Sequence, residues 1–194
     1  MIPINLQINK IDTVFFDFDG VLVDSVPVKT KAYQEIFSPY GAKAVDLITQ
    51  YHAENGGIDR YKKIEYVLKQ LNLDLSVIDE MALKFSDLVK NLVIKADSIP
   101  GMFELLNKLY NDNIPLYIVS GTPEEELRYI VDKRSWSKYF KGIYGSPMTK
   151  VDIVDMILQK NNYSSRRSVF IGDAVTDYKT ALTHNLWYVG VPVN

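Results

Sequence analysis

The stretch Val14-Phe15-Phe16-Asp17-Phe18-Asp19-Gly20 decides how this sequence folds. Its apolar residues form an uninterrupted run of β-favouring side chains, which is typical of a strand buried on both faces of a parallel sheet. We expect this strand within residues 11–18, with the carboxylates of Asp17 and Asp19 at its end. In an open parallel sheet, ligands bind beyond the carboxyl ends of the strands. The stretch therefore predicts a buried strand that leads into a polar site.

Strand-like and helix-like segments alternate from Ile99 onward, which predicts a parallel sheet covered by helices on both faces. A helix is expected to start at Thr122-Pro123-Glu124-Glu125, with Thr122 as its N-cap and Pro123 in its first position. Further strands are expected at 115–119, 168–171 and 187–191, and further helices at 100–110, 151–159 and 176–182. The expected fold class is α/β, a three-layer sandwich around a parallel, Rossmann-like sheet.

Residues 25–96 differ from the rest, because their apolar residues recur at spacings of three and four with charged residues between them. Helices are expected at 28–37, 43–54, 59–71 and 77–94. The pattern predicts an all-helical domain over 25–96, inserted into a core made of 1–24 and 97–194.

Composition excludes several kinds of function. With 194 residues, 22 Lys and Arg against 24 Asp and Glu give a net charge of −2, so no basic field favours nucleic acid. The absence of cysteine excludes disulfides, thiol nucleophiles and zinc–thiolate sites. The two histidines, His52 and His184, argue against a Ser-His-Asp hydrolase. Neither a membrane span nor a secretory leader is indicated, so we expect a cytoplasmic protein; no oligomeric state is indicated.

Polar residues follow three of the expected strands and should meet at one edge of the sheet. They are Asp17 and Asp19 after the first strand, Ser120 and Gly121 after the second, and Asp173 and Asp177 after the third, with Lys150 at a helix start. Carboxylates converging without histidine or cysteine suit a hard cation, and Mg²⁺ fits best. The hydroxyl, the glycine N–H and the lysine would surround a phosphoryl group, so the pattern indicates phosphoryl transfer.

Structural roles for the same residues stay open at this point. The acids could be turn or helix-capping residues, and Thr176 could cap its helix in place of Asp173 or Asp177. An isolated lysine is usually a solvated charge, and Lys141 is a rival to Lys150.

The ordered motifs resemble those of the haloacid dehalogenase (HAD) superfamily, above all its phosphatases and phosphomutases with a helical cap. They are Asp17-Phe18-Asp19-Gly20-Val21-Leu22-Val23-Asp24-Ser25, Ser120-Gly121-Thr122, Lys150 and Gly172-Asp173-Ala174-Val175-Thr176-Asp177. The resemblance implies that Asp17 is the nucleophile, Asp19 the general acid and base, and Ser120 and Lys150 the phosphoryl-binding residues, with Gly121 and Thr122 beside them. It also implies a Mg²⁺ site made by the Asp17 side chain, the Asp19 main-chain carbonyl, Asp173 and, through water or Lys150, Asp177.

Two positions refine this resemblance. Val21 stands where many relatives have threonine, which we do not expect to remove activity. Asp19 is a second carboxylate that members cleaving carbon–halogen or carbon–phosphorus bonds usually lack, so its presence favours phosphate esters.

Within the helical segment, the loop Gly56-Gly57-Ile58-Asp59-Arg60 most strongly suggests a functional role. Two glycines can make a loop flexible, and the planar guanidinium of Arg60 can donate two hydrogen bonds to a phosphate or carboxylate. The alternative is a helix–helix turn, with Asp59 as the cap and Arg60 in solvent. His52, Lys62 and Lys63 are weaker candidates for the same role.

We therefore expect a magnesium-dependent phosphatase that acts on a small phosphorylated metabolite, such as a sugar phosphate or phosphoglycolate, through an aspartyl-phosphate. The alternatives are a phosphomutase on the same scaffold, which needs a closed cap that excludes water, and a phosphosugar-binding protein without turnover. A signalling receiver also accepts phosphate on aspartate, but the residue order and the helical insert argue against it.

Overall fold

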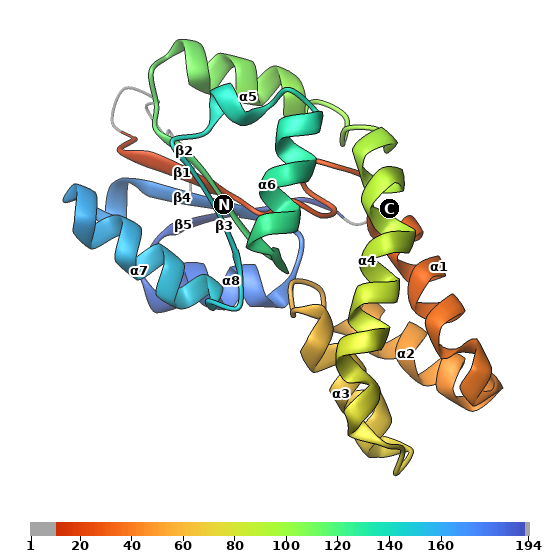
Figure 1. Ribbon diagram of the computed structural model, residues 1–194. Helices are drawn as coiled ribbons and strands as arrows, with labels where there is room; N and C mark the ends of the chain where they lie inside the picture. The colour runs from red at the N-terminus through yellow and green to blue at the C-terminus, as the bar shows by residue number, and fades with distance from the viewer. Residues whose placement is uncertain (1–10, 193–194) are drawn as a thin grey trace.

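A five-stranded parallel sheet lies at the centre of the computed structural model, which describes residues 11–192 (Figure 1). The strands are β1 (Thr13–Phe16), β2 (Leu116–Pro123), β3 (Gly142–Ser146), β4 (Ser168–Gly172) and β5 (Trp187–Gly190), in the order β3-β2-β1-β4-β5. Phe16 lies in register with Ile118 of β2 and with Ile171 of β4. The three central strands therefore end at the same edge, as the sequence predicts.

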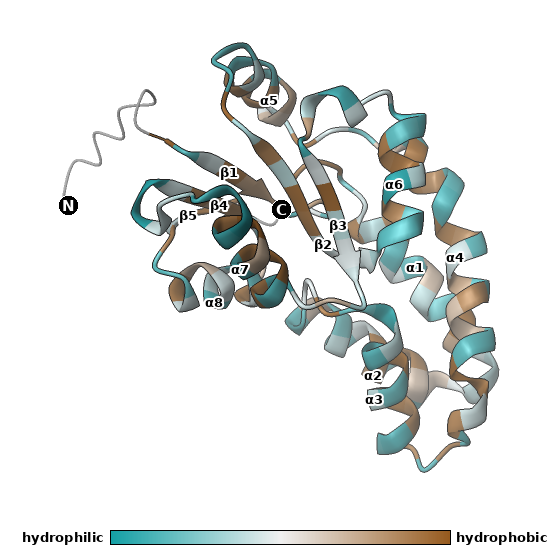
Figure 2. Ribbon diagram, turned by 60° about the vertical axis from the view of Figure 1, so that its left-hand side comes forward, coloured by the Kyte–Doolittle hydropathy of each residue, from teal (hydrophilic) through white to brown (hydrophobic). Residues whose placement is uncertain are grey.

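Helices cover both faces of the sheet, as Figure 2 shows. Phe16 packs with the cluster that includes apolar residues of α5 (Met102–Asn111) and α6 (Glu124–Lys133). Phe15 points to the opposite face, against residues of α7 (Lys150–Asn161) and α8 (Val175–Thr183). Alternate side chains of β1 are thus buried on both faces, which explains its unbroken apolar run and confirms the three-layer α/β fold.

Four further helices lie between β1 and α5, to one side of the sheet in Figure 1. They are α1 (Val26–Phe37), α2 (Ala42–Glu54), α3 (Arg60–Gln70) and α4 (Ile78–Lys95). The chain enters and leaves this helical insert side by side, because Asp24 N donates to Asp97 O at 2.9 Å and Ile99 N to Leu22 O at 3.2 Å. Of the core expected at 1–24 and 97–194, residues 1–10 and 193–194 lie outside the described part.

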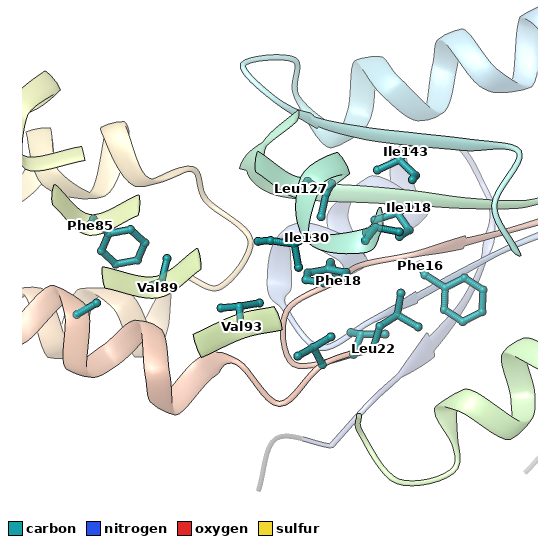
Figure 3. Packing of buried hydrophobic residues seen from close by; sticks show 14 of the residues in the cluster. Phe16, Phe18, Leu22, Phe85, Val89, Val93, Ile118, Leu127, Ile130 and Ile143 are labelled. Atoms are coloured by element: carbon teal, nitrogen blue, oxygen red, sulfur yellow. The ribbon is translucent and has the colours of Figure 1, made fainter. Parts of the chain in front are cut away.

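The apolar core continues from the sheet into the insert. Figure 3 shows Phe85, Val89 and Val93 of α4 leading toward Ile130 of α6 and Phe18 beside β1. These side chains belong to one buried cluster, so α4 is anchored on the sheet-bearing part by apolar packing. Within residues 11–192, no helix combines the length and the apolar character needed to cross a membrane.

Two local predictions differ from the structure. Strand β3 was not expected, because its sequence Gly-Ile-Tyr-Gly-Ser has two glycines and no apolar run, and it lies at the sheet edge. The predicted capping role of Thr122 is wrong: β2 continues through Pro123, which is itself the N-cap of α6.

Candidate active site

Lys150 binds two carboxylates at the edge where the strands end. Its Nζ lies 2.8 Å from Asp17 Oδ2 and 2.6 Å from Asp177 Oδ1, and all three side chains are buried. Lys150 is the first residue of α7, whose N-cap Thr149 accepts a hydrogen bond from Asp152 N at 3.2 Å. This cap fixes where the helix starts and so directs Lys150 toward Asp17.

The rival Lys141 does not reach this site. Its Nζ donates to Asn161 Oδ1 at 2.9 Å and to Tyr163 OH at 3.0 Å, in an exposed position. Of the two lysines that the sequence offered, Lys150 is the one that contacts the acids.

Three carboxylates lie close enough to share a metal ion. Oxygens of Asp17, Asp173 and Asp177 lie within 4.8 Å of one another. Burial raises the pKa of Asp17 although Lys150 lowers it, and burial followed by repulsion from Asp177 raises the pKa of Asp173 to about 6. When all three carboxylates are ionised, their negative charge exceeds the single positive charge of Lys150, which adds to the effect of burial in raising the pKa values of Asp17 and Asp173. An all-oxygen set with excess negative charge fits Mg²⁺.

Asp19 faces a different set of partners. Its carboxylate accepts hydrogen bonds from Lys29 Nζ at 2.6 Å, Ser25 Oγ at 2.5 Å and Thr122 Oγ1 at 2.9 Å. Burial raises the pKa of Asp19, but the Lys29 ammonium and these hydrogen bonds outweigh burial and lower the pKa to about 2. Asp19 is therefore ionised here, whereas a general acid needs a raised proton affinity.

The end of β2 supplies the remaining predicted groups. Ser120 is buried, and its Oγ accepts a hydrogen bond from Thr122 N at 3.2 Å. The Thr122 hydroxyl binds Asp19 and also accepts a hydrogen bond from Lys29 at 2.9 Å, which explains why it does not cap α6. The structure therefore brings Ser120 and Thr122 to the same place as the acids.

The Gly56-Gly57 loop closes over this site from the insert. Thr176 Oγ1 donates to Gly56 O at 3.0 Å, so α8 holds the loop. A Cβ at Gly121 would overlap the carbonyl oxygen of Gly57, and a Cβ at Gly57 would overlap the Thr176 hydroxyl. Gly57 also has a φ of +74°, which favours glycine. The two backbones can meet here because Gly121 has no side chain, and the bare Gly57 leaves room for the Thr176 hydroxyl.

A cavity of about 260 Å³ lies between the sheet edge and the insert. Its lining includes Asp17, Asp19, Ser120, Gly121, Thr122 and Asp173 from the sheet-bearing part. Lys29, His52, Arg60 and Lys63 come from the insert. Such a volume, at the small end of ligand sites, suits a small metabolite.

Arg60 lines this cavity, but its guanidinium is already occupied. It donates to Glu126 Oε1 at 2.6 Å and to Oε2 at 2.9 Å, contacts the Ser86 hydroxyl, and lies 4.8 Å from the centre of the Phe85 ring. Asp59 caps α3 as the alternative interpretation expected, but Arg60 is buried and not in solvent.

Sequence reasoning missed two residues of this region, Lys29 and Glu126. Lys29 follows Ser25 by one helical turn, so the two could be expected to share a face and a partner. Glu126 lies 66 residues from Arg60, and no local pattern connects them.

Comparison with known proteins gives a consistent result. A family model described as haloacid dehalogenase-like hydrolase matches residues 14–191. A phosphoglycolate phosphatase of Photobacterium profundum is 24% identical over 194 residues, covering 95% of this chain and 85% of that protein. One from Pseudomonas fluorescens (strain Pf-5) is 24% identical over 176 residues, covering 87% of this chain and 64% of that protein. Among solved structures, a β-phosphoglucomutase of Clostridium difficile superposes with a TM-score of 0.77 at 20% identity, covering 93% of this chain and 84% of that one.

Proposed function

Because this chain belongs to the haloacid dehalogenase-like hydrolases, in their phosphatase branch, we propose that it hydrolyses phosphate esters of a small metabolite through an aspartyl-phosphate on Asp17. The observation that carries the proposal is the buried contact of Lys150 with both Asp17 and Asp177, beside Asp173 and inside one cavity. A nucleophilic carboxylate needs a fixed direction and partial charge compensation, and this contact supplies both.

Mg²⁺ is the proposed cofactor. Asp17, the Asp19 main-chain carbonyl and Asp173 would hold the ion, and Asp177 would act through water or through its bond to Lys150. When bound, the ion supplies positive charge that neutralises the phosphoryl oxygens. Lys150 Nζ and Ser120 Oγ then bind the remaining oxygens of the group.

In the first half of the reaction, an Asp17 carboxylate oxygen attacks the phosphorus. The bond between phosphorus and the ester oxygen breaks, and the departing oxygen takes a proton from Asp19. Asp19 is ionised while Lys29 binds it, so the acid role requires that Asp19 gain a proton and exchange the Lys29 contact when substrate enters.

In the second half, water attacks the phosphorus of the aspartyl-phosphate and passes its proton to Asp19. The phosphorus–oxygen bond to Asp17 breaks, which releases inorganic phosphate and restores the Asp17 carboxylate. The ionised Asp19 of this structure has the protonation state that a base needs.

Residues 25–96 form, in this proposal, a cap domain that selects the leaving group. Four cavity residues of the insert, Lys29, His52, Arg60 and Lys63, lie across from the acids. A sugar phosphate or phosphoglycolate fits the size and charge of the site, and the phosphoglycolate phosphatases among the relatives support that class.

A phosphomutase is the second candidate, because the insert is closed on the sheet edge by the Thr176–Gly56 hydrogen bond and the Arg60–Glu126 ion pair. A closed site can exclude water, so that the phosphoryl group returns to a second hydroxyl of the substrate.

The test measures inorganic phosphate released from p-nitrophenyl phosphate and a panel of sugar phosphates, with Mg²⁺ or with EDTA. Metal-dependent release by the native protein that disappears in Asp17→Asn supports the proposal. Asp24→Asn is the matched control, since Asp24 is an exposed aspartate of the same segment. An isomerised sugar phosphate without free phosphate indicates the mutase, and saturable binding without either product indicates a binding protein.

A further inference from the structure

Three cationic side chains line the cavity, and two of them have a carboxylate partner. Lys29 binds Asp19 at 2.6 Å, and Arg60 binds Glu126 at 2.6 Å. Lys63 differs: among residues 11–192, no carboxylate oxygen lies within 4.0 Å of its Nζ. The residue is nonetheless only 2% exposed. A buried charge without a counter-charge is unfavourable, so a ligand that supplies one would bind strongly here.

The polar neighbour of Lys63 does not compensate its charge. Lys63 Nζ lies 2.8 Å from His52 Nδ1, and the Tyr33 ring centre lies 5.9 Å from Nζ. Burial and the adjacent Lys63 lower the pKa of His52 to about 3, so the imidazole is neutral and accepts the hydrogen bond. Burial, followed by repulsion from Lys29, lowers the pKa of Lys63 to about 7. His52 thus positions the ammonium but leaves its charge unpaired.

We propose that Lys63 Nζ binds a second anionic group of the substrate, a carboxylate or a phosphate, at the end opposite the transferred phosphoryl group. The inference rests on the proposed function and names the substrate class as small phosphate esters with a second anion.

The sequence favoured Arg60 as the residue that binds a second anion. Both terminal nitrogens of its guanidinium, however, donate to the Glu126 carboxylate. Lys63 follows it by three residues on α3, and both line the cavity that contains Asp17. The subsite is therefore on the same helix as the predicted one but uses a different cation, because the fold has already neutralised the arginine.

The test compares Lys63→Met with Lys62→Met. Lys62 is the adjacent lysine, and its side chain is 63% exposed, so it controls for loss of charge on α3. Three esters are used: 2-phosphoglycolate, which carries a carboxylate; glucose 1,6-bisphosphate, which carries a second phosphate; and p-nitrophenyl phosphate, which has no second anion. In Lys63→Met we expect KM for one of the first two to rise about 10- to 100-fold more than KM for p-nitrophenyl phosphate, as loss of one charged hydrogen bond predicts.

The outcomes separate this inference from the proposed function. The ester with the larger KM increase identifies the second anion, and Lys63→Arg should restore part of the affinity. Equal changes for all three esters in an active protein would overturn the Lys63 subsite while the phosphatase remains. If the native protein releases no phosphate, calorimetric titration with 2-phosphoglycolate and glucose 1,6-bisphosphate decides: weaker binding by Lys63→Met supports the subsite, and unchanged or undetectable binding overturns it.

Discussion

Arg60 of α3 and Glu126 of α6 form a buried, two-pronged ion pair that joins the helical insert to the sheet-bearing part of the chain. The exposed fractions of the two side chains are 3% and 8%. The pair engages the guanidinium for which the sequence suggested a substrate contact, and it holds α3 beside the cavity that α3 helps to line. Four predictions test this arrangement and the site that it closes.

Glu126→Gln should destabilise the protein by about 3 kcal/mol or more, because it leaves the Arg60 guanidinium buried without a counter-charge. Arg60→Met combined with Glu126→Leu should restore much of that stability, since no unpaired charge then remains. Urea unfolding measures both variants, with the exposed Glu125→Gln as the control. A Glu126→Gln protein as stable as the native one would show that the pair does not hold the parts together.

Lys29→Met should move the acidic limb of the pH–rate profile upward. Lys29 is the main cause that lowers the pKa of Asp19 to about 2, so without it only the Ser25 and Thr122 hydrogen bonds oppose burial and the pKa rises. The ionised fraction of Asp19 then falls within the measurable acidic range, and kcat falls with it, because the second half of the reaction needs Asp19 as a base. The control is Lys31→Met, an exposed lysine of the same helix. Identical acidic limbs in native and Lys29→Met proteins would remove Asp19 from the proton transfer.

Asp173→Asn should stabilise the metal-free protein at pH 7.5. The pKa of Asp173 is raised to about 6 in the folded state, so ionising it above that pH opposes folding; the penalty decreases as the pH falls through 6 toward 3.8. After allowance for partial solvent screening, we expect a gain of about 1–2 kcal/mol at pH 7.5 and little at pH 4.

With Mg²⁺ present, the native protein should instead be more stable than Asp173→Asn, because the ion binds the native carboxylate and the variant lacks that ligand. Thermal unfolding of the native and Asp173→Asn proteins, with EDTA and with Mg²⁺, measures both the gain without metal and its reversal with the ion. If Asp173→Asn were the less stable protein in EDTA at pH 7.5, the excess negative charge at this site would be disproved.

Gly57→Ala should remove activity, whereas Gly41→Ala should not. Both glycines have positive φ, +74° and +88°, so both variants should lose about 1 kcal/mol of stability. An alanine Cβ at Gly57 overlaps the Thr176 hydroxyl and lies 3.0 Å from Lys150 Nζ, but at Gly41 nothing lies within 4 Å. Phosphate release separates the two effects. Equal activity losses would indicate a general response to strain and no contact of the loop with the site.

Several elements could be predicted because their signals are local. The unbroken run before Asp17 indicated a strand buried on both faces, and the helix expected at 151–159, with Lys150 at its start, is found as α7. Strand β3 was missed because Gly142 and Gly145 weaken its pattern, and its place depends on pairing with β2. Thr122 was misread because the capping pattern is local, whereas its hydroxyl binds Asp19, 103 residues away.

By itself the sequence determined the α/β class, the helical insert and the acids at the strand ends, because the hydrophobic period and the alternation of strand and helix patterns follow from neighbouring residues. The tertiary structure alone decided which cation meets which carboxylate. Lys150 meets Asp17, Lys29 meets Asp19 and Arg60 meets Glu126, leaving Lys63 without a carboxylate partner among residues 11–192. Such pairings depend on how α1, α3 and α7 pack against the sheet edge, and distances between residues far apart in the chain are set only when the helices are in place.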